Sequence, residues 1–232
     1  NRYWYVDIIK MLMPVRIDRV IIRKGEFHFR NFSSDPQVNL FVKDIQLTAE
    51  NLSNGEELVD SLFARAHVTG VALDDAQVNL EVTTDPFAEL PTFTFDFAMG
   101  DLHLVRLSDL MKAYTPFDFE GGTMDLTIRA YADSGDVTGH ITPEFHDLAV
   151  FRWQEDVKED VPSVVEAFLQ SIAGSVGELF IDKGQNTYST EIPLEATLDA
   201  RDTELPTVIG KMLKNAFIKA LMPRIERVIG AE

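Results

Sequence analysis

The side chains that could do chemistry are scattered along this chain and form no catalytic motif. The sequence has no G-x-S-x-G, G-x-G-x-x-G, Walker-type loop or H-E-x-x-H, the spacings of nucleophile elbows, phosphate loops and zinc proteases. It has no cysteine, which excludes disulfides, thiol nucleophiles and cysteine-ligated metals. Among 38 acidic residues many carboxylates will be close by chance, so a glycosidase-type pair cannot be argued. We predict that the chain is not an enzyme and has no catalytic residue.

One segment does gather metal-binding residue types. His140, Glu144, His146 and Asp147 are close in sequence and could contribute to a metal site. The alternative is a polar connection between strands, and we favour it. We therefore predict no metal site and no cofactor.

Charge is distributed unevenly along the chain. Residues 1–30 carry seven Lys/Arg against three Asp/Glu, and residues 204–232 carry five against three, so residues 31–203 hold nine against 32 and a net charge of −23. Such an acidic middle repels phosphate backbones, so we expect no nucleic-acid partner. The basic ends could face anionic lipid headgroups, although solvation or pairing with acidic neighbours is the simpler interpretation.

Most of the chain alternates apolar and polar residues, the pattern of half-buried strands. We predict strands at 38–52, 92–99 continuing through 102–105, 124–131, 137–142, 145–151 and 186–200, with a turn at 121–122. Residues 15–30 read as a hairpin turning at 24–25. Residues 16–30 of it align without gaps to 67–81, a spacing of 51 residues that indicates either an internal repeat or two ordinary hairpins.

Four segments favour helix or docking. Residues 3–13 form a short helix or a docking segment, and 108–114 a short helix capped by Ser108. Residues 162–180 have apolar side chains at helical spacing, and a long amphipathic helix begins at Pro206 and is kinked or ended by Pro223. The apolar stripe of that last helix could dock on the sheet, a membrane surface or a partner; its residues are Ile209, Met212, Leu213, Ala216, Phe217, Ala220 and Leu221.

These elements predict a mainly β fold with some helix. We expect a curved antiparallel sheet of groove or half-barrel type, covered or capped by two amphipathic helices. The chain would be one elongated domain over 1–232, with strands and one short helix over 1–160 and helix, strand and long helix over 161–232. The apolar side chains proposed to line a groove, or to form ordinary core, are Phe27, Phe29, Val78, Leu80, Phe93, Phe95 and Phe97.

Three blocks of sequence carry a family resemblance. They are LMPVRIDRVIIRKGEFHFRNFSSDPQVNLFVKDIQLTAENL at 12–52, PTFTFDFAMGDLHLVRLSDLMKAYTPFDFEGGTMDLT at 91–127 and STEIPLEATLDARDTELPTVIGKMLKNAFIKALMPRI at 189–225. Together they resemble AsmA-like proteins of the Gram-negative envelope, which have TamB-like relatives, in the branch described as a domain of unknown function.

The resemblance implies a periplasmic protein, usually held by an N-terminal membrane anchor that is not in this sequence. It implies a β-rich groove with an apolar lining and a part in moving phospholipid between membranes. Members are often much longer, so the chain is expected to be a module or a small member. Expected partners are phospholipid, a membrane surface or other envelope proteins. A scaffold with a filled core and no lipid is the alternative.

Overall fold

The computed structural model describes residues 16–53, 63–85, 87–115, 117–152, 179–182 and 184–198. Within these residues the chain forms ten strands, a 3-10 helix η2 (Leu104–Leu107) and an α-helix α2 (Ser108–Tyr114). The strands are β1 (Arg16–Asn31), β2 (Val38–Ser53), β3 (Ala64–Ala72), β4 (Ala76–Thr84), β5 (Phe93–His103), β6 (Phe117–Asp133), β7 (Asp136–Arg152), β8 (Leu179–Asp182), β9 (Thr187–Thr190) and β10 (Ile192–Thr197).

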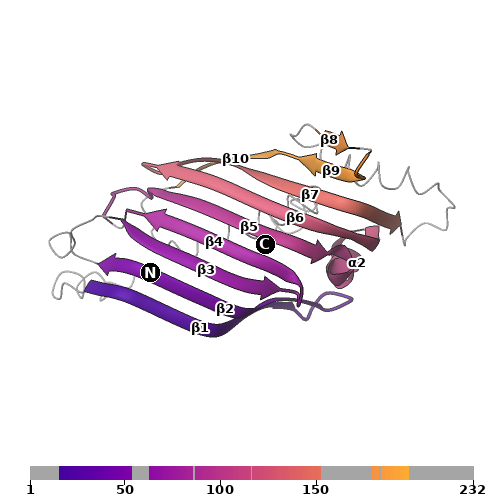
Figure 1. The fold of residues 1–232 in the computed structure, drawn as a ribbon, viewed down its shortest axis with the longest axis horizontal. Helices are drawn as coiled ribbons and strands as arrows, with labels where there is room; N and C mark the ends of the chain where they lie inside the picture. Colours follow the sequence, from indigo (N-terminus) through magenta and orange to yellow (C-terminus); the bar gives the residue numbers. More distant parts are fainter. Residues whose placement is uncertain are drawn as a thin grey trace.

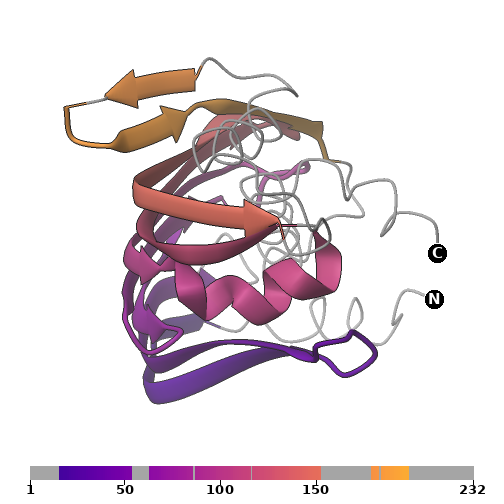
Figure 2. The same cartoon turned by 90° about the vertical axis from the view of Figure 1, so that its right-hand side faces the viewer.

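All ten strands belong to one antiparallel sheet. Its order is β1-β2-β3-β4-β5-β6-β7-β9-β8, and β10 also pairs with β7. Strands that follow one another in the chain lie side by side from β1 to β7 (Figure 1). Seen from the end, the sheet is strongly curved, with β1 and the β8–β9 pair at opposite ends of the curve (Figure 2). The predicted curved antiparallel sheet is confirmed.

The predicted hairpin at 15–30 is wrong. β1 runs as a single strand through the expected turn, because β2 pairs with it on both sides, at Ile22↔Leu47 and at Phe27↔Val42. Lys24, at φ 56°, and Gly25 form an irregularity in the ladder instead of a turn. An extra residue can be absorbed this way as a bulge that bends the strand.

The aligned segment at 67–81 does form a hairpin. β3 and β4 are joined by a turn in which Leu73 and Asp74 have positive φ. Two segments 51 residues apart therefore take up different structures, and the alignment does not mark a structural repeat.

Three further sequence predictions need correction. The turn at Gly121–Gly122 is a bulge inside β6. The two strands expected around Pro143 are the single strand β7, and Pro143 falls where the outer edge of β7 passes from β10 to β9. The single strand expected at 186–200 is divided into β9 and β10.

The short helix is confirmed at its predicted bounds, Ser108–Tyr114, but its cap is not. Leu107 occupies the N-cap position and no side chain caps the helix. The helix is held by packing: Leu110 and Met111 are buried, as are Leu104 and Leu107 of η2, and both helices contact β6.

The other predicted helices, at 3–13 and 206–223, lie outside the described residues, as does most of 162–180. The last two residues of that segment, 179–180, begin strand β8 and are not helical. No helix among the described residues is long and apolar enough to cross a membrane.

Candidate functional site: the apolar face of the sheet

A continuous line of apolar side chains crosses eight strands on one face of the sheet. Each member is the register partner of the next, which places their side chains side by side on the same face. We call this line the apolar row; its residues are Ile22, Leu47, Val68, Leu80, Phe97, Ile128, Ile141 and Ile192.

Burial changes along the apolar row. From β6 onward the row is core: Ile128, Ile141 and Ile192 are buried. In β2 to β5 the members Leu47, Val68, Leu80 and Phe97 are only partly buried, and Ile22 on β1 is 44% exposed. The apolar row is therefore buried in β6, β7 and β10 and partly or largely exposed from β5 to β1. Apolar surface is accessible over that half of the sheet.

The structure divides the groove residues predicted from sequence into three groups. Phe93 and Phe95, at 2% and 0% exposure, are core. Val78, Leu80 and Phe97 are partly buried and pack against that core. Phe27 and Phe29, at 62% and 43% exposure, are exposed on β1.

The predicted helical stripe is not part of the described structure. Ile209, Met212, Leu213, Phe217 and Leu221, with Ala216 and Ala220, all lie outside the described residues. Sequence analysis also left Leu47, Val68, Ile128 and Ile141 out of the candidate site. Each was visible in an alternating pattern, but only the strand register shows that they continue the same line.

β1 is an edge strand among the described residues, and it is apolar on both faces. It pairs with β2 on one side only. Ile21 is exposed, and its register partner Thr48 lies on the face opposite to Leu47. Ile22 and Phe27 are exposed on the other face.

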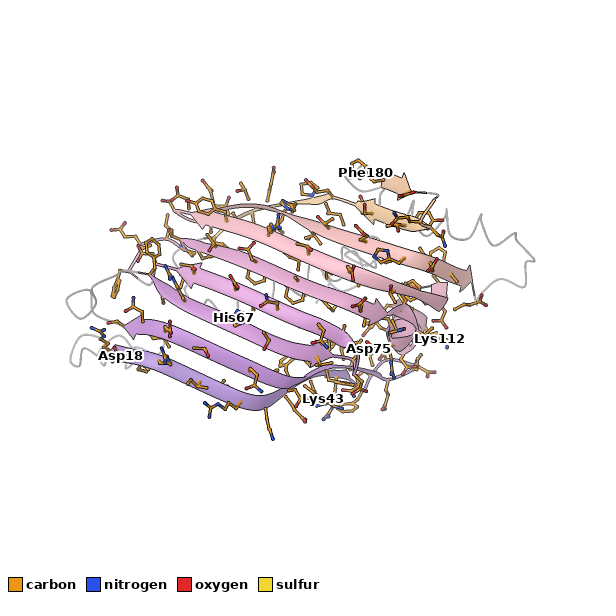
Figure 3. The ribbon with its side chains drawn as sticks, viewed as in Figure 1. Asp18, Lys43, His67, Asp75, Lys112 and Phe180 are labelled. Atoms are coloured by element: carbon orange, nitrogen blue, oxygen red, sulfur yellow. The ribbon has the colours of Figure 1, made fainter. Side chains whose placement is uncertain are left out.

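The opposite face of the sheet is polar. A row of register partners on this face lies beside the apolar row and consists of His67, Glu81, Asp96, Arg129 and His140; His67 is labelled in Figure 3. His67 Nδ1 lies 3.5 Å from Glu81 Oε1, and Arg129 Nε lies 3.7 Å from Asp96 Oδ1. Two faces of opposite character are what a sheet with one solvated side requires.

The polar face contains one group of possible metal ligands within the described residues. His146 Nε2 lies 3.2 Å from Asp125 Oδ2 and 3.4 Å from Glu144 Oε1, and the three ligand atoms are all within 4.8 Å of one another. Sequence analysis named Glu144 and His146 but missed Asp125, because it lies on β6 and reaches Glu144 only through the strand register. His140 and Asp147, also named there, are not in the group.

One buried ion pair ties helix α2 to the sheet. Lys112 Nζ lies 3.0 Å from Asp118 Oδ2, and the Asp118 side chain is only 4% exposed. The Phe119 backbone N–H donates to the other carboxylate oxygen at 2.8 Å. Both oxygens have partners, so this carboxylate is structural and not a candidate acid or base.

Comparisons with protein-family models, with curated proteins and with solved structures found no match to this chain. The resemblance to AsmA-like proteins therefore stays a prediction.

Proposed function

We propose that this domain binds lipid acyl chains along the exposed part of the apolar row. The observation that supports this most is that Val68, Leu80 and Phe97 are only partly buried, although each has a strand on both sides. Adjacent apolar side chains in a continuous line provide the lining that sites for apolar ligands use. An acyl chain placed there gains about 0.8 kcal/mol for each methylene removed from water.

The length of the exposed part suits an acyl chain. Neighbouring strands lie about 4.8 Å apart, so the four steps from Ile22 to Phe97 span about 19 Å. One leaflet of a bilayer holds acyl chains in a hydrocarbon layer of about 15 Å, half of a ~30 Å core. A phospholipid tail could therefore lie across these strands.

We further propose that the two amphipathic helices expected at 162–180 and 206–223, the first without residues 179–180 of β8, cover or cap the apolar face. The partly exposed row gives them a surface that matches their apolar stripes. The alternatives for the stripe from Ile209 to Leu221 are a membrane surface and a partner protein.

Within this proposal the chain is a non-enzymatic periplasmic module of an AsmA-like protein that takes part in phospholipid transfer for outer-membrane maintenance. The curved sheet and its apolar row support that placement, since the resemblance implies a β-rich groove with an apolar lining. The polar face would lie toward water.

A structural or interaction scaffold of the envelope is the second candidate. The burial of Phe93, Phe95, Ile128 and Ile141 favours it, because in this half of the sheet the apolar side chains are packed away from solvent. In that case the exposed apolar side chains of β1 would contact another envelope protein.

The lipid-binding and scaffold candidates predict different phospholipid affinities for a variant in which a residue of the apolar row is made polar. Leu80→Gln and Glu81→Gln introduce the same side chain at neighbouring positions of β4, on opposite faces of the sheet. We expect Leu80→Gln to weaken binding of a fluorescent phospholipid analogue at least tenfold, while Glu81→Gln binds like the unmodified chain. Circular dichroism shows whether both variants are folded. Equal binding by both variants would contradict the lipid proposal and favour the scaffold.

A further inference from the structure

We propose that Asp125, Glu144 and His146 form a binding site for a divalent transition-metal ion of the Zn²⁺ type on the polar face. This site is independent of the apolar row, which lies on the other face. Asp125 comes from β6, and Glu144 and His146 come from β7. Asp125 and Glu144 are register partners, and His146 lies two residues along β7 from Glu144, so the sheet itself holds the three side chains together.

The two distances from His146 Nε2 to the carboxylate oxygens are close to those around a tetrahedral ion. Zinc binds imidazole nitrogen and carboxylate oxygen at about 2.0–2.2 Å, which puts tetrahedral ligands about 3.3–3.5 Å from one another. The separations of His146 Nε2 from Asp125 Oδ2 and Glu144 Oε1 are 3.2 and 3.4 Å. An ion could be placed between them with little movement of the side chains.

The ring of His146 is oriented so that its two nitrogens have different neighbours. Nε2 points toward the two carboxylates, and Nδ1 lies 3.3 Å from the Thr187 hydroxyl. In the tautomer that is protonated at Nδ1, the Nε2 atom offers a lone pair. One imidazole nitrogen and two carboxylate oxygens then form a set of three possible ligand atoms that lie within 4.8 Å of one another.

The supporting contacts are those of a metal site. Ligating histidines usually donate their second N–H to a fixed acceptor, and the Thr187 hydroxyl, 3.3 Å from His146 Nδ1, is placed to be that acceptor. Asp125 is held in a similar way, because the Asp101 backbone N–H donates to its Oδ1 at 2.8 Å and leaves Oδ2 for the ion. The three side chains are 33–46% exposed, so an ion can enter from solvent and water can complete its coordination.

The ligand set selects the class of ion. Imidazole suits zinc, copper, nickel and iron, whereas magnesium and calcium prefer oxygen ligands alone. Zinc accepts a mixed nitrogen and oxygen set with an open fourth position, so Zn²⁺ is the probe of choice.

Calorimetric titration of the full chain with Zn²⁺, without a histidine tag, tests the site. We expect one Zn²⁺ per chain, with affinity lowered at least tenfold in His146→Ala and in Asp125→Asn. Thr187→Val should lower the Zn²⁺ affinity by about tenfold, because His146 Nδ1 loses the hydroxyl that lies 3.3 Å away. His140→Ala is the matched control, since His140 lies on the same strand and face but outside the group, and it should bind as the unmodified chain does.

Co²⁺ gives a second readout that surface adsorption would not produce. Visible ligand-field bands should appear with the unmodified chain and be absent with His146→Ala. If the unmodified chain shows no saturable Zn²⁺ binding, the proposal is overturned. It is equally overturned if His146→Ala binds Zn²⁺ as tightly as the unmodified chain.

Discussion

Phe95 and Phe97 stand two positions apart on β5 and point to the same face, yet Phe95 is fully buried and Phe97 is partly exposed. The alternating sequence predicts their common face but not this difference. Burial depends on what packs above each side chain, and that is set by elements distant in the sequence. Residues that look equivalent in the pattern therefore divide between the buried core and the partly exposed apolar surface.

Phe95→Ala tests the core assignment. Truncating a buried phenylalanine removes transfer free energy and leaves a cavity, so we expect the free energy of unfolding to fall by about 3–5 kcal/mol. Urea denaturation measures the change. Phe27→Ala is the control, because Phe27 is 62% exposed and its truncation should cost within about 0.5 kcal/mol. Similar losses for the two variants would be inconsistent with the burial described.

A Lys112→Met variant tests how much the ion pair with the buried Asp118 carboxylate stabilises the fold. In Lys112→Met, Asp118 Oδ2 loses the ammonium that lies 3.0 Å away and remains enclosed, because the carboxylate is buried. We expect a loss of about 1–3 kcal/mol, the usual cost of a buried polar group left without its partner. Thermal or urea unfolding at neutral pH gives the value. A change within error would mean that water replaces the lysine.

At the scale of elements, the sequence pattern predicts that most strands exist, but it does not predict where the longest strands begin and end. The helix at 108–114 and the strand at 38–52 follow from local pattern alone. β1, β6 and β7 each run through residues that locally favour a turn, namely Gly25, Gly121–Gly122 and Pro143. Pairing with long neighbouring strands outweighs those local preferences, and no single segment contains that information.

The candidate metal ligands illustrate the same limit. Glu144 and His146 were identifiable because they are neighbours in sequence, whereas Asp125 joins them only through the β6–β7 register. A register prediction for these two strands would have been needed to find the third residue.

Gly121 and Gly122 form a matched pair for testing the β6 bulge. Gly122 has φ +99°, and a Cβ there would lie 2.7 Å from the His146 carbonyl oxygen. At Gly121 the nearest atom would be 3.9 Å away. We expect Gly122→Ala to destabilise the fold by about 1–3 kcal/mol through the left-handed backbone and the overlap. Gly121→Ala should change stability by less than about 1 kcal/mol.

Equilibrium unfolding of Gly122→Ala and Gly121→Ala, measured in parallel, gives the two changes in stability. Equal stability of the two alanine variants would show that Gly122 is not constrained as the structure indicates. Because a Cβ at position 122 would overlap the backbone of His146 and Asp147, this replacement should in addition disturb the nearby candidate metal site.

At the scale of the whole molecule, the described sheet has two faces of different chemical character. One curved sheet carries a packed core at β5–β7 and β10, a partly exposed apolar row toward β1, and a polar face on the opposite side. The lipid proposal and the metal proposal use opposite faces, so each can fail without the other. The sequence pattern predicted a sheet with one apolar face, whereas the gradient of burial along that face came only from the structure.

Native mass spectrometry of the purified chain, followed by lipid extraction, tests the central claim most directly. The account predicts phospholipid bound to the unmodified chain and to Glu81→Gln, and loss of that lipid from folded Leu80→Gln. A folded, unmodified chain that carries no phospholipid and takes up none from vesicles of phosphatidylethanolamine and phosphatidylglycerol would contradict it.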